Sequence, residues 1–245
     1  MNEEKFDGKA ALYSSARPGY PVALFEALRE KEILTSDTTA ADIGSGTGIF
    51  TLLLLPYVKK IFAVEPNEDM RKAAEKAFCC QDNVVSVCGG AESTGLSEGS
   101  VSLVTAAQAF HWFDRAAFQK ECRRILKAHG KVVLLWNERD ESCPLVSKNL
   151  ALNERFFGKR CGAEGMSRDF SDFFKGEYTH LSFENPLSYT EEMFLRRCLS
   201  SSYAPKKGKV GYASYASALK ELFKRHEKDG TADYSYTTNV YFGSV

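Results

Sequence analysis

The chain lacks several features that would point to a particular partner. Its 245 residues include 32 Lys plus Arg and 32 Asp plus Glu, so the formal net charge is zero. Proteins that bind duplex nucleic acid usually carry a basic excess, so nucleic acid is not an expected partner. No stretch approaches the roughly 20 apolar residues that cross a bilayer, and no membrane contact is expected.

The cysteine pattern gives no sign of a metal site or of disulfide bonds. The seven cysteines are an odd number, are scattered and include no C-x-x-C pair. This pattern predicts reduced thiols, with adjacent Cys79 and Cys80 at a helix end, and no metal site. Residues 1–5 are polar and no apolar segment follows them, so no secretory signal is expected. Together these features predict a cytoplasmic protein.

What is present has the pattern of an α/β domain. Apolar residues make up 44% and charged residues 26%, which are ordinary globular values, and the length suits one large domain. Short apolar runs alternate with amphipathic stretches between residues 40 and 137, as in a parallel sheet wound on both faces. The strands are predicted near 39–44, 61–65, 84–88, 101–106 and 131–137, and helices over 67–78 and 114–127.

A glycine-rich loop follows the first predicted strand. The run from Thr38 to Ile43 opens into Gly44, Gly46 and Gly48, and a helical stretch over 49–55 follows. Glycines let the backbone turn tightly and approach a ligand, and strand, loop and helix form the nucleotide-binding corner of such sheets.

The spacing of that loop separates two cofactor classes. A dinucleotide fingerprint needs a further glycine at position 49, where Ile49 stands. The carboxylate of Asp42, two residues before the first glycine, suits a ligand that presents an ammonium group; a helix-capping role is the alternative.

The second predicted strand also ends in an acid, Glu65. It lies 17 residues past Gly48, where a carboxylate can bind both ribose hydroxyls of an adenosine. Alternatively, Glu65 only begins a turn with Pro66 and Asn67.

Five motifs in order give the chain its resemblance to a family. It resembles the class I S-adenosylmethionine (SAM)-dependent methyltransferases along essentially its whole length. Segment 42–48 resembles their D-x-G-x-G-x-G loop, 64–66 the acidic strand end, and 89–92 the turn beside the adenine. Segment 107–113 (Ala-Gln-Ala-Phe-His-Trp-Phe) resembles a subgroup that includes trans-aconitate methyltransferases, and Tyr13 with 17–21 matches its N-terminal signature.

The resemblance implies a Rossmann-like doubly wound sheet, mostly parallel with an antiparallel last strand over 237–244, plus a helical cap. We expect a single domain over 1–245. Its core would comprise about 32–140 and 231–245. The cap would come from 1–31, with a helix at 21–31, and from 141–230, with helices near 190–200 and 212–228. A cap beyond the strand ends would shape the substrate site.

One residue departs from the family pattern. The usual Asp beside the adenine amino group is Gly90 here, so Glu92 or a backbone carbonyl would have to accept that hydrogen bond. The resemblance otherwise implies SAM as the cofactor and one set of residues around it: Tyr13, Arg17, Asp42, Gly44, Ser45, Gly46, Gly48, Glu65, Pro66, Ala91, Glu92 and Gln108.

The N-terminal motif has two readings. Arg17 can pair with a carboxylate of the cofactor or of an acidic substrate through its bidentate fork, with Tyr13 closing over the cofactor. Alternatively, Arg17 and Pro18 only start a helix that the tyrosines pack down.

His111 is the candidate catalytic residue. Its unperturbed pKa of about 6.5 suits a general base, although it can instead orient its loop through the backbone. The aromatic face of Trp112 favours a cation. Candidate substrate contacts are Tyr20, Trp112, Trp136, Arg139 and Tyr203. Arg196 and Arg197 have a weaker claim, because charged pairs on a helix usually face solvent. Residues 166–174 are expected to pack in the core.

The sequence therefore predicts a SAM-dependent methyltransferase that acts on a small molecule, with a carboxylate or other oxygen acceptor. The alternatives are an NAD-dependent oxidoreductase and a SAM-binding module without activity. Neither the acceptor nor the oligomeric state follows from these patterns.

Overall fold

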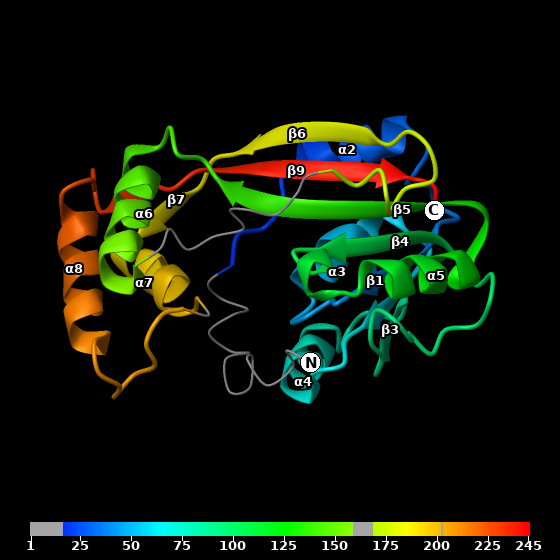
Figure 1. The fold of residues 1–245 in the computed structure, drawn as a ribbon, viewed down its shortest axis with the longest axis horizontal. Coiled ribbons are helices and arrows are strands. Elements are labelled where there is room, and N and C mark those ends of the chain that lie inside the picture. The colour runs from blue at the N-terminus through cyan, green and yellow to red at the C-terminus, as the bar shows by residue number, and fades with distance from the viewer. Residues whose placement is uncertain (1–16, 159–168, 202) are drawn as a thin grey trace.

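The computed structural model describes residues 17–158, 169–201 and 203–245 (Figure 1). Tyr13 of the N-terminal motif lies outside the described residues, as do positions 166–168 of the predicted core segment.

A seven-stranded sheet forms the centre of the described part of the chain. Its strand order is β3-β2-β1-β4-β5-β9-β6. Strands β1 to β5 pair in parallel, whereas β9 runs antiparallel to both β5 and β6, so the predicted antiparallel final strand is confirmed. The strands are β1 Thr39–Ile43, β2 Lys60–Val64, β3 Val84–Val87, β4 Val101–Ala107, β5 Leu126–Arg139, β6 Thr179–Asn185 and β9 Tyr236–Gly243.

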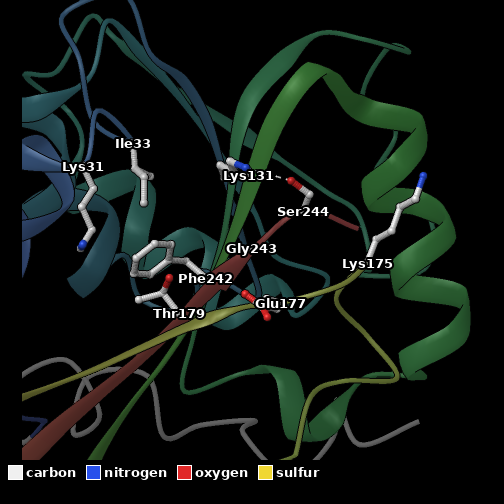
Figure 2. Close-up of a pocket in the computed structure, with 9 residues that line it drawn as sticks. All are labelled: Lys31, Ile33, Lys131, Lys175, Glu177, Thr179, Phe242, Gly243 and Ser244. Atoms are coloured by element: carbon white, nitrogen blue, oxygen red, sulfur yellow. Dashed lines mark hydrogen bonds between the residues drawn. The ribbon is translucent and has the colours of Figure 1, made fainter.

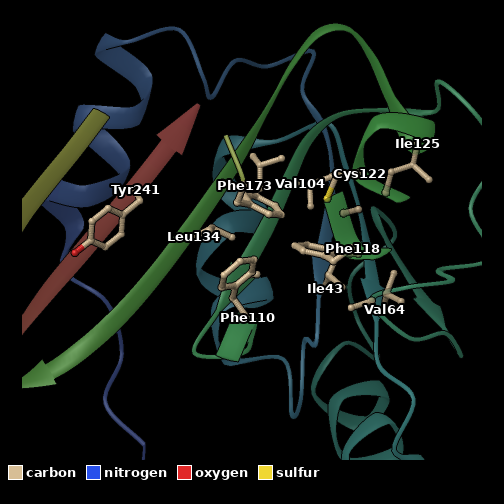
Figure 3. Packing of buried hydrophobic residues seen from close by; sticks show 14 of the residues in the cluster. Ile43, Val64, Val104, Phe110, Phe118, Cys122, Ile125, Leu134, Phe173 and Tyr241 are labelled. Carbon is tan, nitrogen blue, oxygen red and sulfur yellow. The ribbon is translucent and has the colours of Figure 1, made fainter. Parts of the chain in front are cut away.

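Helices cover both faces of the sheet, because side chains alternate between the faces along each strand. Val133 and Leu135 of β5 pack with helices α2 (Val22–Glu30) and α3 (Ile49–Leu54), while Trp136 packs on the opposite face with α5 (Arg115–Ile125). Figure 3 shows this second cluster. The remaining core helix is α4 (Glu68–Ala77), and short 3-10 turns span Leu55–Tyr57 (η2) and Phe110–Trp112 (η3).

Two side chains start helices where the sequence predicted. Asn67 accepts a hydrogen bond from the backbone N–H of Met70 at the start of α4. Asp114 does the same for Ala117 at the start of α5. Such caps satisfy backbone donors that have no partner within the helix.

A helical cap lies beyond the ends of β5, β9 and β6 (Figure 1). It contains α6 (Pro144–Phe157), α7 (Glu191–Leu199), α8 (Tyr212–Lys224) and a hairpin of β7 (Ser188–Thr190) and β8 (Thr231–Asp233). Its apolar residues, such as Leu150, Phe194 and Tyr215, form a core of their own. The three strands lead directly into it, so the cap and the sheet share continuous backbone.

The cap is smaller than the sequence predicted. Helix α2 was expected in it, but Leu24, Phe25 and Leu28 are buried against the sheet. Residues 179–185 were also assigned to it, yet they form β6 at the sheet edge, where much of the strand is solvent-exposed and leaves only a weak apolar alternation. Strand β5 begins at Leu126 rather than near 131, because a register irregularity lets it pair with β4 earlier.

The aromatic segment before β6 packs as expected where it is described. Phe170, Phe173 and Phe174 are at most 2% exposed and join the cluster of Figure 3. The six described cysteines are free thiols, and the Cys79 and Cys80 sulfurs lie 3.6 Å apart just after α4. None of the helices in the described ranges is long and apolar enough to span a membrane.

Candidate active site

The candidate residues lie close to the carboxyl ends of the parallel strands. The glycine loop follows β1, Glu65 follows β2, Ala91 and Glu92 follow β3, and Gln108 and His111 follow β4. The chain order reverses between the neighbouring strands β1 and β4. Open α/β sheets bind ligands at the carboxyl ends of the strands beside such a switch point.

The three loop glycines have positive φ values of 68°, 57° and 82°, which residues with a Cβ rarely adopt. A Cβ on Gly44 would lie 2.7 Å from the Cβ of Ala109, and one on Gly48 would collide with the ring of Phe78. A Cβ on Gly46 would meet no atom within 4 Å. Gly44 and Gly48 are therefore required for packing, whereas Gly46 presents an open backbone face.

Glu65 holds the loop in place. Its Oε2 accepts a hydrogen bond from the Gly46 N–H at 2.9 Å, and its Oε1 accepts one from the Asn67 N–H at 2.9 Å. Arg71 donates to the carbonyl oxygens of Glu65 and Pro66. The buried carboxylate thus connects the end of β2 to the middle of the glycine loop.

Asp42 lies beneath the loop and is 1% exposed. Its two carboxylate oxygens accept hydrogen bonds from the hydroxyls of Thr51, at 2.6 Å, and Thr105, at 2.8 Å. Burial raises the pKa of Asp42 to about 6; the two threonines act in the opposite direction, and the charge of Glu65 adds to the increase. Asp42 binds the first turn of α3 through a side chain of that helix, which differs from the helix-capping alternative.

The loop has the groups that SAM would require. The hydroxyls of Ser45 and Thr47 are buried and have no hydrogen-bond partner among the described residues. Buried polar groups are normally paired, so these two hydroxyls are suited to a ligand. With the open face of Gly46 and the carboxylates of Asp42 and Glu65, they fit a ligand that has both an ammonium group and a ribose.

The turn after β3 contains a carboxylate near Gly90, where the family usually has an Asp. Glu92 places its Oε2 3.6 Å from where a Cβ of Gly90 would stand, and its Oε1 accepts a hydrogen bond from the Asp114 N–H. A carboxylate is therefore present beside Gly90, although it comes from two residues farther along. Ala91, next to it, is buried in the core.

The N-terminal motif is attached to the end of β5. The carbonyl oxygen of Gly19 accepts hydrogen bonds from the side-chain amides of Asn137 and Asn185, both at 3.0 Å. Tyr20 packs edge-on against Phe50 in α3, with ring centroids 5.0 Å apart. Arg17 is partly buried two residues before Gly19. This segment therefore connects the glycine-loop helix to the ends of β5 and β6.

Gln108 connects the ends of β4 and β5. Its backbone has a φ of 57°, uncommon for a residue with a side chain, and its Nε2 donates to the carbonyl of Asn137 at 3.2 Å. Such strain persists where the surroundings enforce it, often at functional sites.

His111 lies on the exposed 3-10 turn after β4, and one of its contacts is with the side chain of Trp136. The indole N–H of Trp136 points to its Nδ1 at 3.4 Å. An indole nitrogen only donates, so this contact assigns Nδ1 as the acceptor and puts the imidazole proton on Nε2.

The substrate prediction for Trp136 is wrong. Its side chain is 0% exposed and its ring stacks on Phe170 at a centroid distance of 5.5 Å, so the core encloses it. Trp112, by contrast, is 39% exposed beside His111.

Arg139 and Tyr203, each predicted to contact substrate, lie in contact with each other. The guanidinium Nη2 of Arg139, at the end of β5, donates to the Tyr203 hydroxyl at 2.8 Å. Asn153 of α6 donates to the same hydroxyl at 3.2 Å. These groups lie where β5 enters the cap.

A shallow hollow elsewhere does not belong to this site. Figure 2 shows it near the amino ends of the parallel strands. Its volume is about 200 Å³. Its lining comprises Lys31, Ile33, Lys131, Lys175, Glu177, Thr179, Phe242, Gly243 and Ser244. No cluster of three or more metal-ligating side chains occurs within the described ranges.

Several functional contacts were missed from the sequence. Thr105 was detectable as a polar residue within the apolar run of β4, but nothing in the sequence paired it with Asp42. Asn185 gave no signal, because its partner is a backbone carbonyl far away in the chain.

The sheet order, the glycine loop and the two acidic strand ends define a class: α/β proteins that bind a nucleoside-containing ligand at the β1–β4 switch point. Residues 41–134 match the family described as methyltransferase domain. Two Schizosaccharomyces pombe proteins are similar to this chain. An uncharacterised methyltransferase is 34% identical over 172 residues, which are 70% of this chain and 66% of the relative. An uncharacterised methyltransferase-like protein is 35% identical over 144 residues, which are 58% of this chain and 55% of the relative. The matches thus span only 55–66% of these relatives.

A solved structure gives the same architecture over most of the chain. A type II methyltransferase from Anaeromyxobacter dehalogenans superposes with a TM-score of 0.65, covering 93% of this chain and 97% of that one, at 24% identity. Residues 41–134 are thus similar to methyltransferase domains in sequence, and the chain shares the fold of a solved methyltransferase. SAM is the cofactor that this family implies.

Proposed function

We propose that the protein transfers a methyl group from SAM to a carboxylate oxygen of a small molecule. When bound, SAM supplies a methyl group on a cationic sulfur; the acceptor oxygen takes the methyl while sulfur keeps the electrons of the broken bond. An acceptor that is already ionised releases no proton, so the step requires no general base. The balanced charge of the chain supports a small molecule over nucleic acid, and its free cysteines support a cytoplasmic location.

The contact between Trp136 and His111 carries this proposal. It holds the imidazole as a donor at Nε2, an arrangement suited to orienting an anion rather than to removing a proton. The resemblance of segment 107–113 to a subgroup that includes trans-aconitate methyltransferases supports the same acceptor class. His111 would then position the acceptor, and alignment and exclusion of water would supply most of the rate.

The cofactor residues follow from the loop geometry. Asp42 would attract the ammonium group of SAM, Glu65 would bind the ribose hydroxyls, and Glu92 would accept from the adenine amino group. Ser45 and Thr47 would donate through hydroxyls that have no other described partner.

The test combines binding with product chemistry. We expect S-adenosylhomocysteine (SAH) to bind in calorimetry with micromolar affinity, whereas NAD should not bind. Incubation with methyl-labelled SAM and a panel of small carboxylic acids and amines should yield label that mild alkali releases as methanol, as from a methyl ester. Alkali-stable label would indicate a nitrogen or carbon acceptor, and binding of NAD alone would contradict the whole proposal.

A further inference from the structure

Two adjacent thiols lie side by side just after helix α4. The Sγ atoms of Cys79 and Cys80 are 3.6 Å apart, and both residues are exposed. Free cysteine is among the most buried residue types in folded proteins, so two exposed neighbours are unusual. The pair therefore differs from Cys122 and Cys198, which pack in the core.

The backbone on either side of the pair is held in place. Phe78, which caps α4, is 7% exposed and packs with Ala63 and Ala74. Its carbonyl oxygen accepts a hydrogen bond from the N–H of Gln81 at 2.8 Å, which closes a turn with the two cysteines at its centre. The turn therefore presents both sulfurs to solvent from a fixed backbone.

A disulfide suits this pair poorly. The Cα atoms of adjacent residues lie about 3.8 Å apart across a trans peptide bond, whereas the Cα atoms of disulfide-bonded residues usually lie about 4.4–6.8 Å apart. A disulfide between neighbours is therefore strained and easily reduced. The pair is better suited to a single atom that bonds to both sulfurs.

The separation of the sulfurs indicates the geometry of such an atom. Zinc–sulfur bonds are about 2.3 Å long, and with bonds of that length two sulfurs 3.6 Å apart subtend an angle of about 100°. A linear ion such as Cu(I) needs its two sulfurs on opposite sides. Zinc and iron–sulfur clusters usually need four protein ligands, and no group of three or more ligating side chains occurs in the described ranges. The remaining fit is a pyramidal centre that makes three single bonds, of which the protein supplies two.

We propose that Cys79 and Cys80 together form a binding site for trivalent arsenic, as arsenite or an organic arsenical. The third bond of arsenic is to an oxygen or carbon group of the ligand, which faces solvent. In the binding step each sulfur bonds to arsenic while a hydroxide leaves arsenic with its bonding electrons and takes up the thiol proton to form water. Two As–O bonds are exchanged for two As–S bonds, arsenic stays trivalent and no oxidant is required.

The dithiol site is separate from the proposed ribose ligand. Helix α4 begins three residues after Glu65, and its ten residues span about 15 Å. The two cysteines follow the other end of that helix. Arsenic binding there uses none of the groups assigned to the cofactor, so it does not depend on the proposed methyl transfer.

The direct test treats the reduced protein with phenylarsine oxide. Intact-mass spectrometry should show one adduct that survives excess 2-mercaptoethanol, a monothiol, and that 2,3-dimercaptopropanol, a dithiol, removes. Because the folded chain holds the sulfurs at bridging distance, it should bind more tightly than the unfolded chain, and the adduct should raise the unfolding temperature. Loss of the adduct to the monothiol, or an unfolding temperature that does not rise, would overturn the proposal.

Serine variants locate the site. Cys79→Ser and Cys80→Ser should each lower retention against the monothiol by about a hundredfold or more, because the second As–S bond forms within one molecule. Both side chains are exposed, so both variants should fold normally. Cys88→Ser is the matched control, since Cys88 is an exposed thiol without an adjacent cysteine in the sequence, and it should keep full retention. Retention that persists in both pair variants, or that disappears in Cys88→Ser, would refute the assignment.

Discussion

The backbone N–H of Gly46 donates to the carboxylate of Glu65 at 2.9 Å, and this bond ties the centre of the glycine loop to the end of the neighbouring strand. The same carboxylate is the proposed ribose ligand. On this proposal Glu65 has two roles, because the carboxylate that shapes the loop would also bind the ligand.

Replacing this carboxylate should affect binding more than folding. Glu65→Gln leaves one oxygen to accept an N–H but turns an amide donor toward the other, so we expect SAH affinity to fall by about tenfold or more. Calorimetry provides the measurement. Glu75→Gln, on the outer side of α4, is the control. Unchanged affinity in Glu65→Gln would refute the ribose assignment.

The raised pKa of Asp42 predicts opposite pH trends for stability and binding. Folding favours the protonated form, so this contribution to stability is fully present below the ordinary pKa of 3.8 and is lost as pH rises through about 6. The difference amounts to about 3 kcal/mol. Asp42→Asn should remove this dependence in urea unfolding between pH 4 and 7.

Binding should change in the other direction. An ammonium group is attracted to the ionised carboxylate, so SAH affinity should increase as pH rises through about 6 and should become flat in Asp42→Asn. Asp82→Asn, at an exposed position, is the control. A wild-type affinity that does not vary over this range would contradict the role given to Asp42.

Substitutions of Gly48 and Gly46 should separate a loss of stability from a loss of SAH binding. Gly48→Ala adds both backbone strain and a collision with Phe78, and we expect it to cost about 2–5 kcal/mol of stability. Gly46→Ala adds strain alone, about 1–2 kcal/mol, but puts a methyl group on the open face and should abolish SAH binding. Denaturant unfolding and calorimetry on both variants measure the contrast. Similar stability losses with intact binding in Gly46→Ala would show that its face does not meet the ligand.

If Trp136 acts through His111, substitutions of the two residues should lower turnover in a non-additive way. Trp136→Phe keeps an aromatic core residue but removes the indole donor, so the turnover number should fall while SAH affinity stays constant. In a His111→Ala background the same change should add nothing, which a double-mutant cycle measures. Additive losses would mean that the two residues act separately.

Local patterns predicted the parallel half of the molecule well. The alternation of apolar runs located β1 to β4, and Asn67 and Asp114 marked the helix starts because a side-chain cap is a local interaction. The loop glycines and Glu65 were identified from spacing alone. In each case the information lies within a few residues of the chain.

Contacts between distant segments escaped prediction. Trp136 was assigned to substrate because it ends a strand beside the site, but its burial comes from Phe170 and Phe173, more than thirty residues later in the chain. Strand β6 has little apolar alternation, and only its pairing with β9 defines it. The burial of Arg197 depends on Tyr236 in the same way.

The position of β9 between β5 and β6 also has a consequence for synthesis. Both neighbours precede β9 in the chain, and Leu134 of β5 pairs with Tyr241 near the far end of the sequence. While the chain is being made, β5 therefore presents an unpaired edge that is open to aggregation, and β6 has no place in the sheet. We expect the half of the sheet that supports the cap to assemble last, after the strands around the glycine loop.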